Sequence, residues 1–373
     1  MSRKRPLPST SARRRPLVIL VKLAVSIFII FGLISRSGHY TESVTEASTQ
    51  NRKFLNDFER NSKIAFLFLV RENIPLDFVW HVFFKNGDQL DFSIYIHSKP
   101  GFEFNKRTTR SSFFYGRQIR HSIKVNWGEP TMIQAERLLL EEALNDPTNQ
   151  RFILLSDSCV PLYNFTHIYN YLMSSPKSFV DSFVVAEKED RYNVKMLPTI
   201  PLNKWRKGSQ WISLIRRHAE LVMDDAVVYR AFKRFCKPLQ PPLKNSSTHL
   251  HIESDSNNCI PDEHFVQTFL AMSELEGELE RRSVTYSLWN QSGGEFDTKS
   301  WHPTTFDSDN TSPQQIKEIK SISNIYFKSE DRREICRINS TFVPCFLFAR
   351  KFNPDAGVLL LKQGMIGPYD PSI

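Results

Sequence analysis

The chain has 373 residues, of which 40% are hydrophobic, and its formal net charge is +9 at pH 7. Residues 1–16 contribute six basic side chains and no acidic one, which leaves only +3 for the rest of the chain. The charge therefore does not indicate a nucleic-acid partner, and the hydrophobic content is typical of a globular body.

An apolar run over 17–34 follows the basic tail. It is interrupted only by Lys22, Ser26 and Gly32. As a helix it would span about 27 Å, close to the roughly 30 Å hydrocarbon core of a bilayer. A cleavable signal peptide has a shorter apolar core and a small-residue cleavage site, which the Ile-rich end of this run does not offer. We therefore expect a transmembrane signal anchor at 17–35, with the tail 1–16 in the cytosol and the remainder in the lumen, as in a single-pass type II protein.

The segment 36–61 is rich in Ser, Thr, Glu, Asn and Arg and has few apolar positions. This composition predicts a stem that holds the body, residues 62–373, away from the bilayer.

Asn-x-Ser/Thr sequons, which only a chain in the secretory lumen can use, support the same compartment. They lie at Asn164, Asn245, Asn290, Asn310 and Asn339.

The cysteines are too few for a disulfide scaffold but allow two bridges and one free thiol. Cys336 and Cys345 enclose a short loop and are the first predicted pair; Cys236 with Cys259 is the second. Cys159 lies in an apolar strand context, where a buried thiol is expected. No cysteine spacing indicates a zinc site.

The body begins with an alternation of strands and helices. Strands are predicted at 64–70, 92–97 and 151–156, and helices at 75–85 and 132–144. This order predicts an α/β fold with a central, mainly parallel sheet.

Ligands of such sheets bind at the carboxyl ends of the strands. His97, Ser98 and Asp157 are expected at this edge, where they are candidates for donor-nucleotide contacts, although a polar strand cap is also compatible with His97 and Ser98. The sequence contains no Gly-x-Gly-x-x-Gly, no Gly-Lys-Ser/Thr and no Gly-x-Ser-x-Gly, which disfavours Rossmann, P-loop and hydrolase interpretations.

Seven sequence blocks resemble the core-2/I-branching N-acetylglucosaminyltransferases, glycosyltransferase family 14, in its plant form. They include Trp127-Gly-Glu-Pro, Pro261-Asp-Glu and Trp205-Arg-Lys-Gly-Ser-Gln-Trp, and they lie at 63–69, 95–101, 127–136, 154–162, 205–211, 259–265 and 345–352. The resemblance implies a GT-A-like fold, transfer of a sugar from a nucleotide donor with inversion, and residence in the Golgi membrane.

Inversion needs one carboxylate that takes the proton of the attacking hydroxyl. The resemblance assigns this role to Glu263 in the Pro261-Asp-Glu motif. The same residues also fit a different interpretation, because proline followed by two acids is typical of a helix start.

The leaving diphosphate gains negative charge, which many GT-A enzymes offset with a metal ion on an Asp-x-Asp motif. The strand end here has only Asp157, and Asp307-Ser-Asp309 lies in a polar loop with the composition of a solvated turn. The resemblance implies that basic side chains replace the metal. Lys351 matches the family's diphosphate-binding lysine, and Arg337 or Arg350 is the candidate second cation. No metal or other cofactor is expected.

The aromatic and polar block 205–211 predicts an acceptor-binding loop, because aromatic faces stack on sugars while polar groups bind hydroxyls. Its candidate residues are Trp205, Gly208, Ser209, Gln210 and Trp211, and a core position is an equal alternative for Trp211.

The sequence thus predicts a Golgi glycosyltransferase that moves a sugar from a UDP-sugar to a glycan or glycoprotein hydroxyl. The donor sugar stays open among N-acetylglucosamine, xylose and glucuronate. A lumenal sugar-binding or scaffold protein of the same fold without turnover is the alternative.

Overall fold

The computed structural model describes residues 62–185, 191–238, 258–289, 302–338 and 340–367. The predicted tail, signal anchor and stem, and the sequons at Asn245, Asn290 and Asn339, lie outside these residues. Within the described ranges, no helix has both the length and the apolar character needed to cross a bilayer.

The strands and helices predicted at the start of the body are confirmed. They are β1 (Lys63–Leu69), α2 (Asp77–Lys85), β2 (Phe92–His97), α3 (Thr131–Leu144) and β3 (Asn149–Ser156). β1 is a continuous apolar run because helices cover both of its faces, and its side chains from Ile64 to Leu69 are all buried.

The main sheet has the strand order β2-β1-β3-β6-β5-β7. Its further strands are β5 (Ser178–Phe179), β6 (Ser213–Ile215) and β7 (Leu279–Glu280). β1 pairs in parallel with β2 and β3, and β5 with β7, whereas β6 is antiparallel to both of its neighbours. The sheet is therefore mainly parallel, as predicted.

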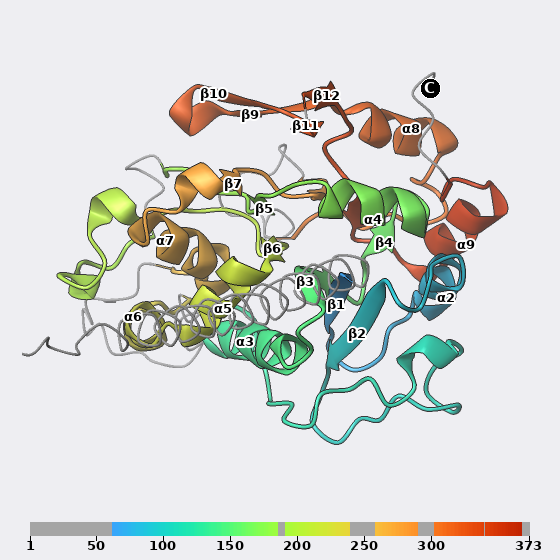
Figure 1. The fold of residues 1–373 in the computed structure, drawn as a ribbon, viewed down its shortest axis with the longest axis horizontal. Helices are drawn as coiled ribbons and strands as arrows, with labels where there is room; N and C mark the ends of the chain where they lie inside the picture. The colour runs from blue at the N-terminus through green and yellow to red at the C-terminus, as the bar shows by residue number, and fades with distance from the viewer. Residues whose placement is uncertain (1–61, 186–190, 239–257, 290–301, 339, 368–373) are drawn as a thin grey trace, which may run out of the picture. The chain divides into compact units, whose positions relative to one another are not determined.

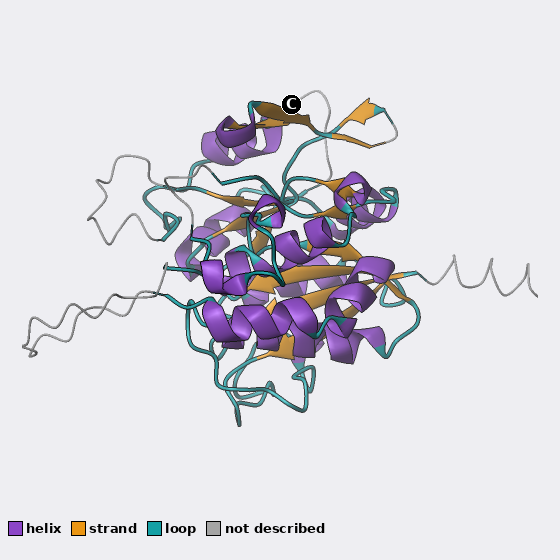
Figure 2. Ribbon diagram, turned by 90° about the vertical axis from the view of Figure 1, so that its left-hand side faces the viewer, coloured by secondary structure: helices purple, strands orange, loops and turns teal. Residues whose placement is uncertain are grey.

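Helices cover the two faces of this sheet, as Figures 1 and 2 show. Alternate side chains of β1 divide the core: Phe66 and Phe68 belong to an apolar cluster with residues of α2, α4 (Phe165–Met173), α8 (Pro313–Ser321) and α9 (Pro354–Lys362). Leu67 and Leu69 belong to a second cluster with residues of α3, α5 (Arg216–Asp224), α6 (Val227–Phe235) and α7 (Phe265–Met272). Each face thus has its own apolar cluster, as the period of two along a strand requires.

A second, smaller sheet has the order β4-β13-β8. It consists of β4 (Val160–Pro161), β8 (Thr285–Ser287) and β13 (Phe348–Arg350). Two antiparallel pairs complete the strands, β9 (Asn324–Phe327) with β10 (Arg332–Ile335), and β11 (Arg337–Ile338) with β12 (Thr341–Phe342). The smaller sheet matters for the site because β13 ends at Arg350.

The carboxyl ends of the three parallel strands are level. Leu69 pairs in register with His97 on one side and with Ser156 on the other. The Phe352 N–H donates to the Ser158 carbonyl at 2.9 Å, which attaches the end of β13 to the same edge. Residues that follow these four strands therefore meet in one place.

Both predicted disulfides, Cys236–Cys259 and Cys336–Cys345, are confirmed, and Cys159 is free and buried as expected. Of the two described sequons, Asn164 caps α4 through its side-chain oxygen. The Asn310 amide nitrogen donates to the Thr305 carbonyl at 3.0 Å.

Candidate active site

The carboxylate predicted as the base lies on a short turn that leads into α7. Pro261–Glu263 form one 3₁₀ turn, and the Glu263 N–H donates to the Ile260 carbonyl at 3.1 Å. The Glu263 side chain is 26% exposed, and Arg191 Nη1 donates to its Oε2 at 2.9 Å. Glu263 is therefore accessible, ion-paired and held on a rigid turn. Arg191 was not predicted from the sequence.

Two neighbours of Glu263 are buried and have shifted pKa values. Burial, together with the charge of Glu263, raises the pKa of Asp262 to about 7, although Arg350 and Arg191 oppose this shift. Burial lowers the pKa of His264 to about 3, and its Nδ1 lies 2.8 Å from the Arg206 carbonyl. His264 is thus neutral near pH 7, so Nδ1 carries the proton and donates it to that carbonyl.

The predicted cations at the end of β13 lie at the same site. The Arg350 guanidinium carbon lies 4.4 Å from the centre of the Trp211 ring, and its Nε is buried without a hydrogen-bond partner among the described residues. Burial and the positive charges of Arg350 and Arg71 lower the pKa of Lys351, while Asp157 opposes them. Asp157 itself lies 3.5 Å from Arg71 in an ion pair.

Arg337 is placed differently from the other predicted cations. It lies on the β11–β12 pair, exposed, with its guanidinium carbon 4.3 Å from the centre of the Phe342 ring. Besides Arg350, the cation whose charge acts on Lys351 is Arg71, two residues after the end of β1. The rule that located His97 and Asp157 at strand ends would also have found Arg71.

An exposed aromatic residue borders this cationic group. The Trp127 side chain is 55% exposed, and its ring centre is 5.5 Å from that of His302. The pKa of His302 is lowered by burial and by the positive charges of Lys351, Arg350 and Arg71. Trp127 belongs to one of the sequence blocks that carry the family resemblance, but it was given no role there.

His97 and Ser98 lie at the predicted edge but are buried. His97 Nε2 accepts a hydrogen bond from the Ile123 N–H at 3.1 Å, and burial lowers the pKa of His97 to about 4. His97 Nδ1 and Ser98 Oγ have no partner within the described part of the chain.

The 205–211 block divides between the core and the site. Trp205 is 2% exposed, and its ring stacks on His264 at 4.4 Å and on Phe232 at 5.5 Å, so the structure places it in the core. Trp211 is also buried but carries Arg350 on its face. Alternation of aromatic and polar residues cannot by itself distinguish a core ring from one that faces a ligand.

The middle of this block is tied to the turn of the base. The Gly208 N–H donates to the Glu263 carbonyl at 2.9 Å, and the Ser209 N–H donates to Asp181 Oδ2 at 3.0 Å. Only glycine fits at 208, because an added Cβ would lie 1.7 Å from the Asp181 carbonyl oxygen. Ser209 and Gln210 are half-buried.

No group of three His, Cys, Asp or Glu residues that could hold a metal ion is found in the described ranges. In the Asp307-Ser-Asp309 motif, Asp307 Oδ1 accepts the backbone N–H of Asp309 and of Asn310. The motif thus forms a polar turn.

Comparisons with known proteins agree with this arrangement. The family model named Branch, Core-2/I-Branching enzyme, matches residues 64–320. The chain is 49% identical over 310 residues to "Glycosyltransferase BC10" of Oryza sativa subsp. japonica, which covers 82% of this chain and 77% of the rice protein. The family-model match contains Glu263, the 205–211 block and the main sheet from Ile64 onward. The chain is therefore a plant-type glycosyltransferase that belongs to the core-2/I-branching enzyme family.

Proposed function

We propose that this glycosyltransferase moves a sugar from a UDP-sugar to a hydroxyl of a glycan or glycoprotein, with inversion and without a bound metal ion. The observation that carries the proposal is the Arg350 guanidinium, whose buried Nε lacks a partner among the described residues. A charge that is partly removed from water requires compensation. A nucleoside diphosphate at the end of β13 would provide it.

Lys351 and Arg71 extend this cationic site. Both lie close enough to Arg350 for their charges to affect one another, and Asp157 is the acid at the same edge. In the proposal, Lys351 and Arg350 bind the diphosphate and stabilise the charge that develops on it, the work that a metal ion performs in other enzymes. His97, Ser98 and Asp157 then border the nucleotide.

Glu263 is proposed as the general base. Arg191 holds its side chain through the ion pair at 2.9 Å, and a carboxylate so held can accept the proton of an attacking hydroxyl. The charges of Glu263, Arg191 and Arg350 all act on the buried Asp262, so the base and the diphosphate-binding cations converge on one region. Ser209 and Gln210, tied to the same turn, are the proposed acceptor contacts, and the donor sugar stays open among N-acetylglucosamine, xylose and glucuronate.

We further propose a Golgi-membrane protein of type II topology. The proposal rests on the basic tail 1–16 and the apolar run 17–34, and two disulfides in the body fit an oxidising lumen.

Two substitutions in the full-length protein, purified in detergent, distinguish the proposed role of Glu263 from that of Lys351. Glu263→Gln keeps the shape of the side chain but accepts no proton, so kcat should fall by about 100-fold or more while the Kd of UDP stays the same. Lys351→Ala should instead raise the Kd of UDP. Glu141→Gln on α3 and Lys362→Ala in the last turn of α9, both at exposed positions, are the matched controls.

Turnover should persist in EDTA. Full activity of Glu263→Gln would overturn the assignment of the base. Loss of wild-type activity in EDTA with recovery in manganese would overturn the metal-free mechanism. A screen of UDP-sugars for protection against thermal unfolding identifies the donor used in these assays.

A further inference from the structure

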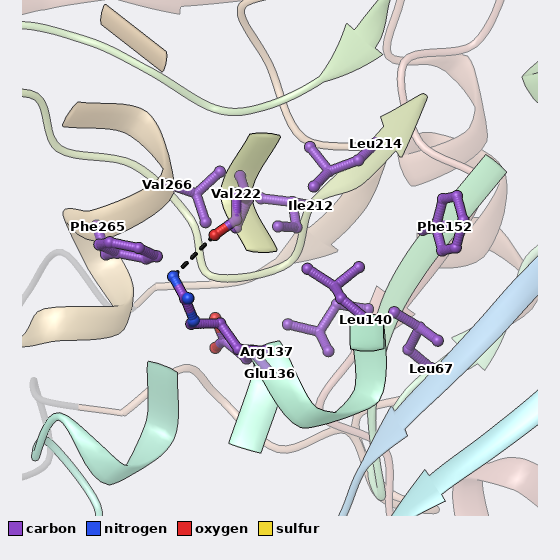
Figure 3. A pocket seen from close by; sticks show the side chains of 11 residues that line it. Leu67, Glu136, Arg137, Leu140, Phe152, Ile212, Leu214, Val222, Phe265 and Val266 are labelled. Carbon is purple, nitrogen blue, oxygen red and sulfur yellow. Dashed lines mark hydrogen bonds between the residues drawn. The ribbon is translucent and has the colours of Figure 1, made fainter. Parts of the chain in front are cut away.

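Glu136 is a carboxyl group in an apolar part of the core. It lies on the buried face of α3 and is 6% exposed. Figure 3 shows it beside a small cavity whose other lining includes Leu140, Ile212 and Phe265. The guanidinium of its neighbour Arg137 donates to the carbonyls of Val222, at 2.8 Å (Figure 3), and of Met223, at 2.7 Å. A carboxyl group in such a place is costly unless it is neutral or has a specific partner.

The partner of Glu136 comes from the predicted acceptor loop. Gln210 Nε2 donates to Glu136 Oε1 at 2.7 Å. The same loop donates from Gly208 to the Glu263 carbonyl, and its Ser209 carbonyl accepts from Gln267 Nε2 at 2.9 Å. Glu136 therefore supports the 208–211 loop from the core. On its other side, the same loop is bonded through Gly208 to the turn of the proposed base.

A second buried carboxyl group, Asp262, acts on Glu136. α3 packs against the Pro261–Glu263 turn, and each carboxyl group is buried. Burial and the charge of Asp262 raise the pKa of Glu136 well above its usual value, more than the hydrogen bond from Gln210 lowers it. Asp262 Oδ1 is buried without a partner among the described residues. Two such groups cannot both ionise at low cost.

We propose that Glu136 is a positioning residue for sugar transfer, which holds Gln210 through the hydrogen bond to its carboxyl group and thereby fixes the 208–211 loop against the turn that carries Glu263. This inference rests on the proposed role of Glu263 as the base. A neutral carboxyl group suits the position because its carbonyl oxygen accepts the Gln210 N–H without placing a second negative charge beside Asp262.

The test compares three variants of the full-length protein. Glu136→Ala removes the acceptor of the Gln210 hydrogen bond and should lower kcat by about 10- to 100-fold, the effect of a displacement on the order of 1 Å at the reacting centre. The Kd of UDP should change by less than about twofold, since the cations of β13 are untouched. Glu136→Gln, a neutral side chain of the same shape, should keep kcat within about threefold of wild type and leave the shape of the pH profile unchanged. Glu141→Ala, an exposed change on the same helix, is the control.

A double variant shows whether Glu136 acts through Gln210. Once Gln210→Ala has removed the donor, adding Glu136→Ala should lower kcat by less than about twofold more. If the two substitutions instead lower kcat independently, so that their effects multiply in the double variant, the proposal is overturned. A Glu136→Gln variant as impaired as Glu136→Ala, or one whose pH profile shifts, would also overturn it. Melting temperatures distinguish a loss of folding from a loss of positioning.

The outcomes separate this inference from the proposed function. If Glu263→Gln is inactive while Glu136→Ala is fully active, only the role of Glu136 is wrong. If Glu263→Gln is fully active, the base is wrong, and the effect of Glu136→Ala on kcat then requires another explanation.

Discussion

Replacing Gly208 by alanine is a severe test of the site geometry, because the 205–211 block and the backbone of Asp181 approach each other closely at this position. The added Cβ would lie 1.7 Å from the Asp181 carbonyl oxygen, whereas real Cβ atoms essentially never come within 3.0 Å of such an atom. The loop and residue 181 must therefore separate by about 1.3 Å, and close-packed interiors absorb such a shift poorly. The Gly208 N–H is bonded to the Glu263 carbonyl, so the displacement is transmitted to the proposed base.

The expected result is a fall in kcat of about 100-fold or more, the usual effect of a displacement on the order of 1 Å from productive geometry. The assay measures transfer from the donor identified in the UDP-sugar screen, together with the melting temperature and the Kd of UDP. Gly277→Ala is the matched control, because nothing lies within 4 Å of a Cβ added there. A Gly208→Ala protein with the kcat and melting temperature of wild type would refute the close approach and the coupling that we derive from it.

Four further predictions follow from the charges, the disulfides and the N-terminal segment. Burial raises the pKa of folded Asp262 to about 7 from an ordinary value of 3.8, so the stability that its proton contributes is complete below pH 3.8 and is lost as the pH rises towards 7. Asp262→Asn should make the melting temperature fall less steeply over that window, and an unchanged slope would contradict the shift. Replacing Cys336 and Cys345, which are 9 residues apart, by serine should lower the free energy of unfolding by about 2–3 kcal/mol in a denaturant titration. An unchanged denaturation midpoint would contradict a stabilising role of this disulfide. Arg71→Ala should raise the Kd of UDP several-fold at low salt and less at high salt, as expected for an exposed cation, and equal affinity at low salt would exclude Arg71 from the site. Protease added to intact microsomes should spare residues 37–373, and digestion of this body would disprove the type II topology.

Much of the fold was predictable because the main sheet begins with β1, a continuous apolar run of the kind expected for a strand that is buried on both faces. β1 to β3 and the two helices between them follow local periodicity, and their carboxyl ends meet as the general rule for parallel sheets requires. The short strands of the smaller sheet were not predicted, because a segment such as β4 has only two residues and depends on its neighbours rather than on its own pattern.

The site was predictable only in part, for a different physical reason. Glu263, Lys351 and Arg350 were located through motifs, and the structure places these residues in one region. Arg191 was missed because an arginine in a polar segment has no local pattern that distinguishes a partner of the predicted base from a solvated side chain, whereas Arg71, two residues after β1, does obey the strand-end rule. Trp205 illustrates the converse, since only the packing of His264 and Phe232 on its ring shows that it belongs to the core.

The Cys236–Cys259 disulfide has a consequence for how the enzyme can change. It joins the end of α6 to the residue just before the Ile260 turn, and the Cys259 N–H also donates to the Lys237 carbonyl at 3.1 Å. The residue that leads into the turn of the proposed base is thus fixed to the end of α6 by a covalent bond and joined to the neighbouring Lys237 by a hydrogen bond. A shift of α6 is therefore transmitted to the start of that turn, so the packing of α6 is coupled to the position of Glu263.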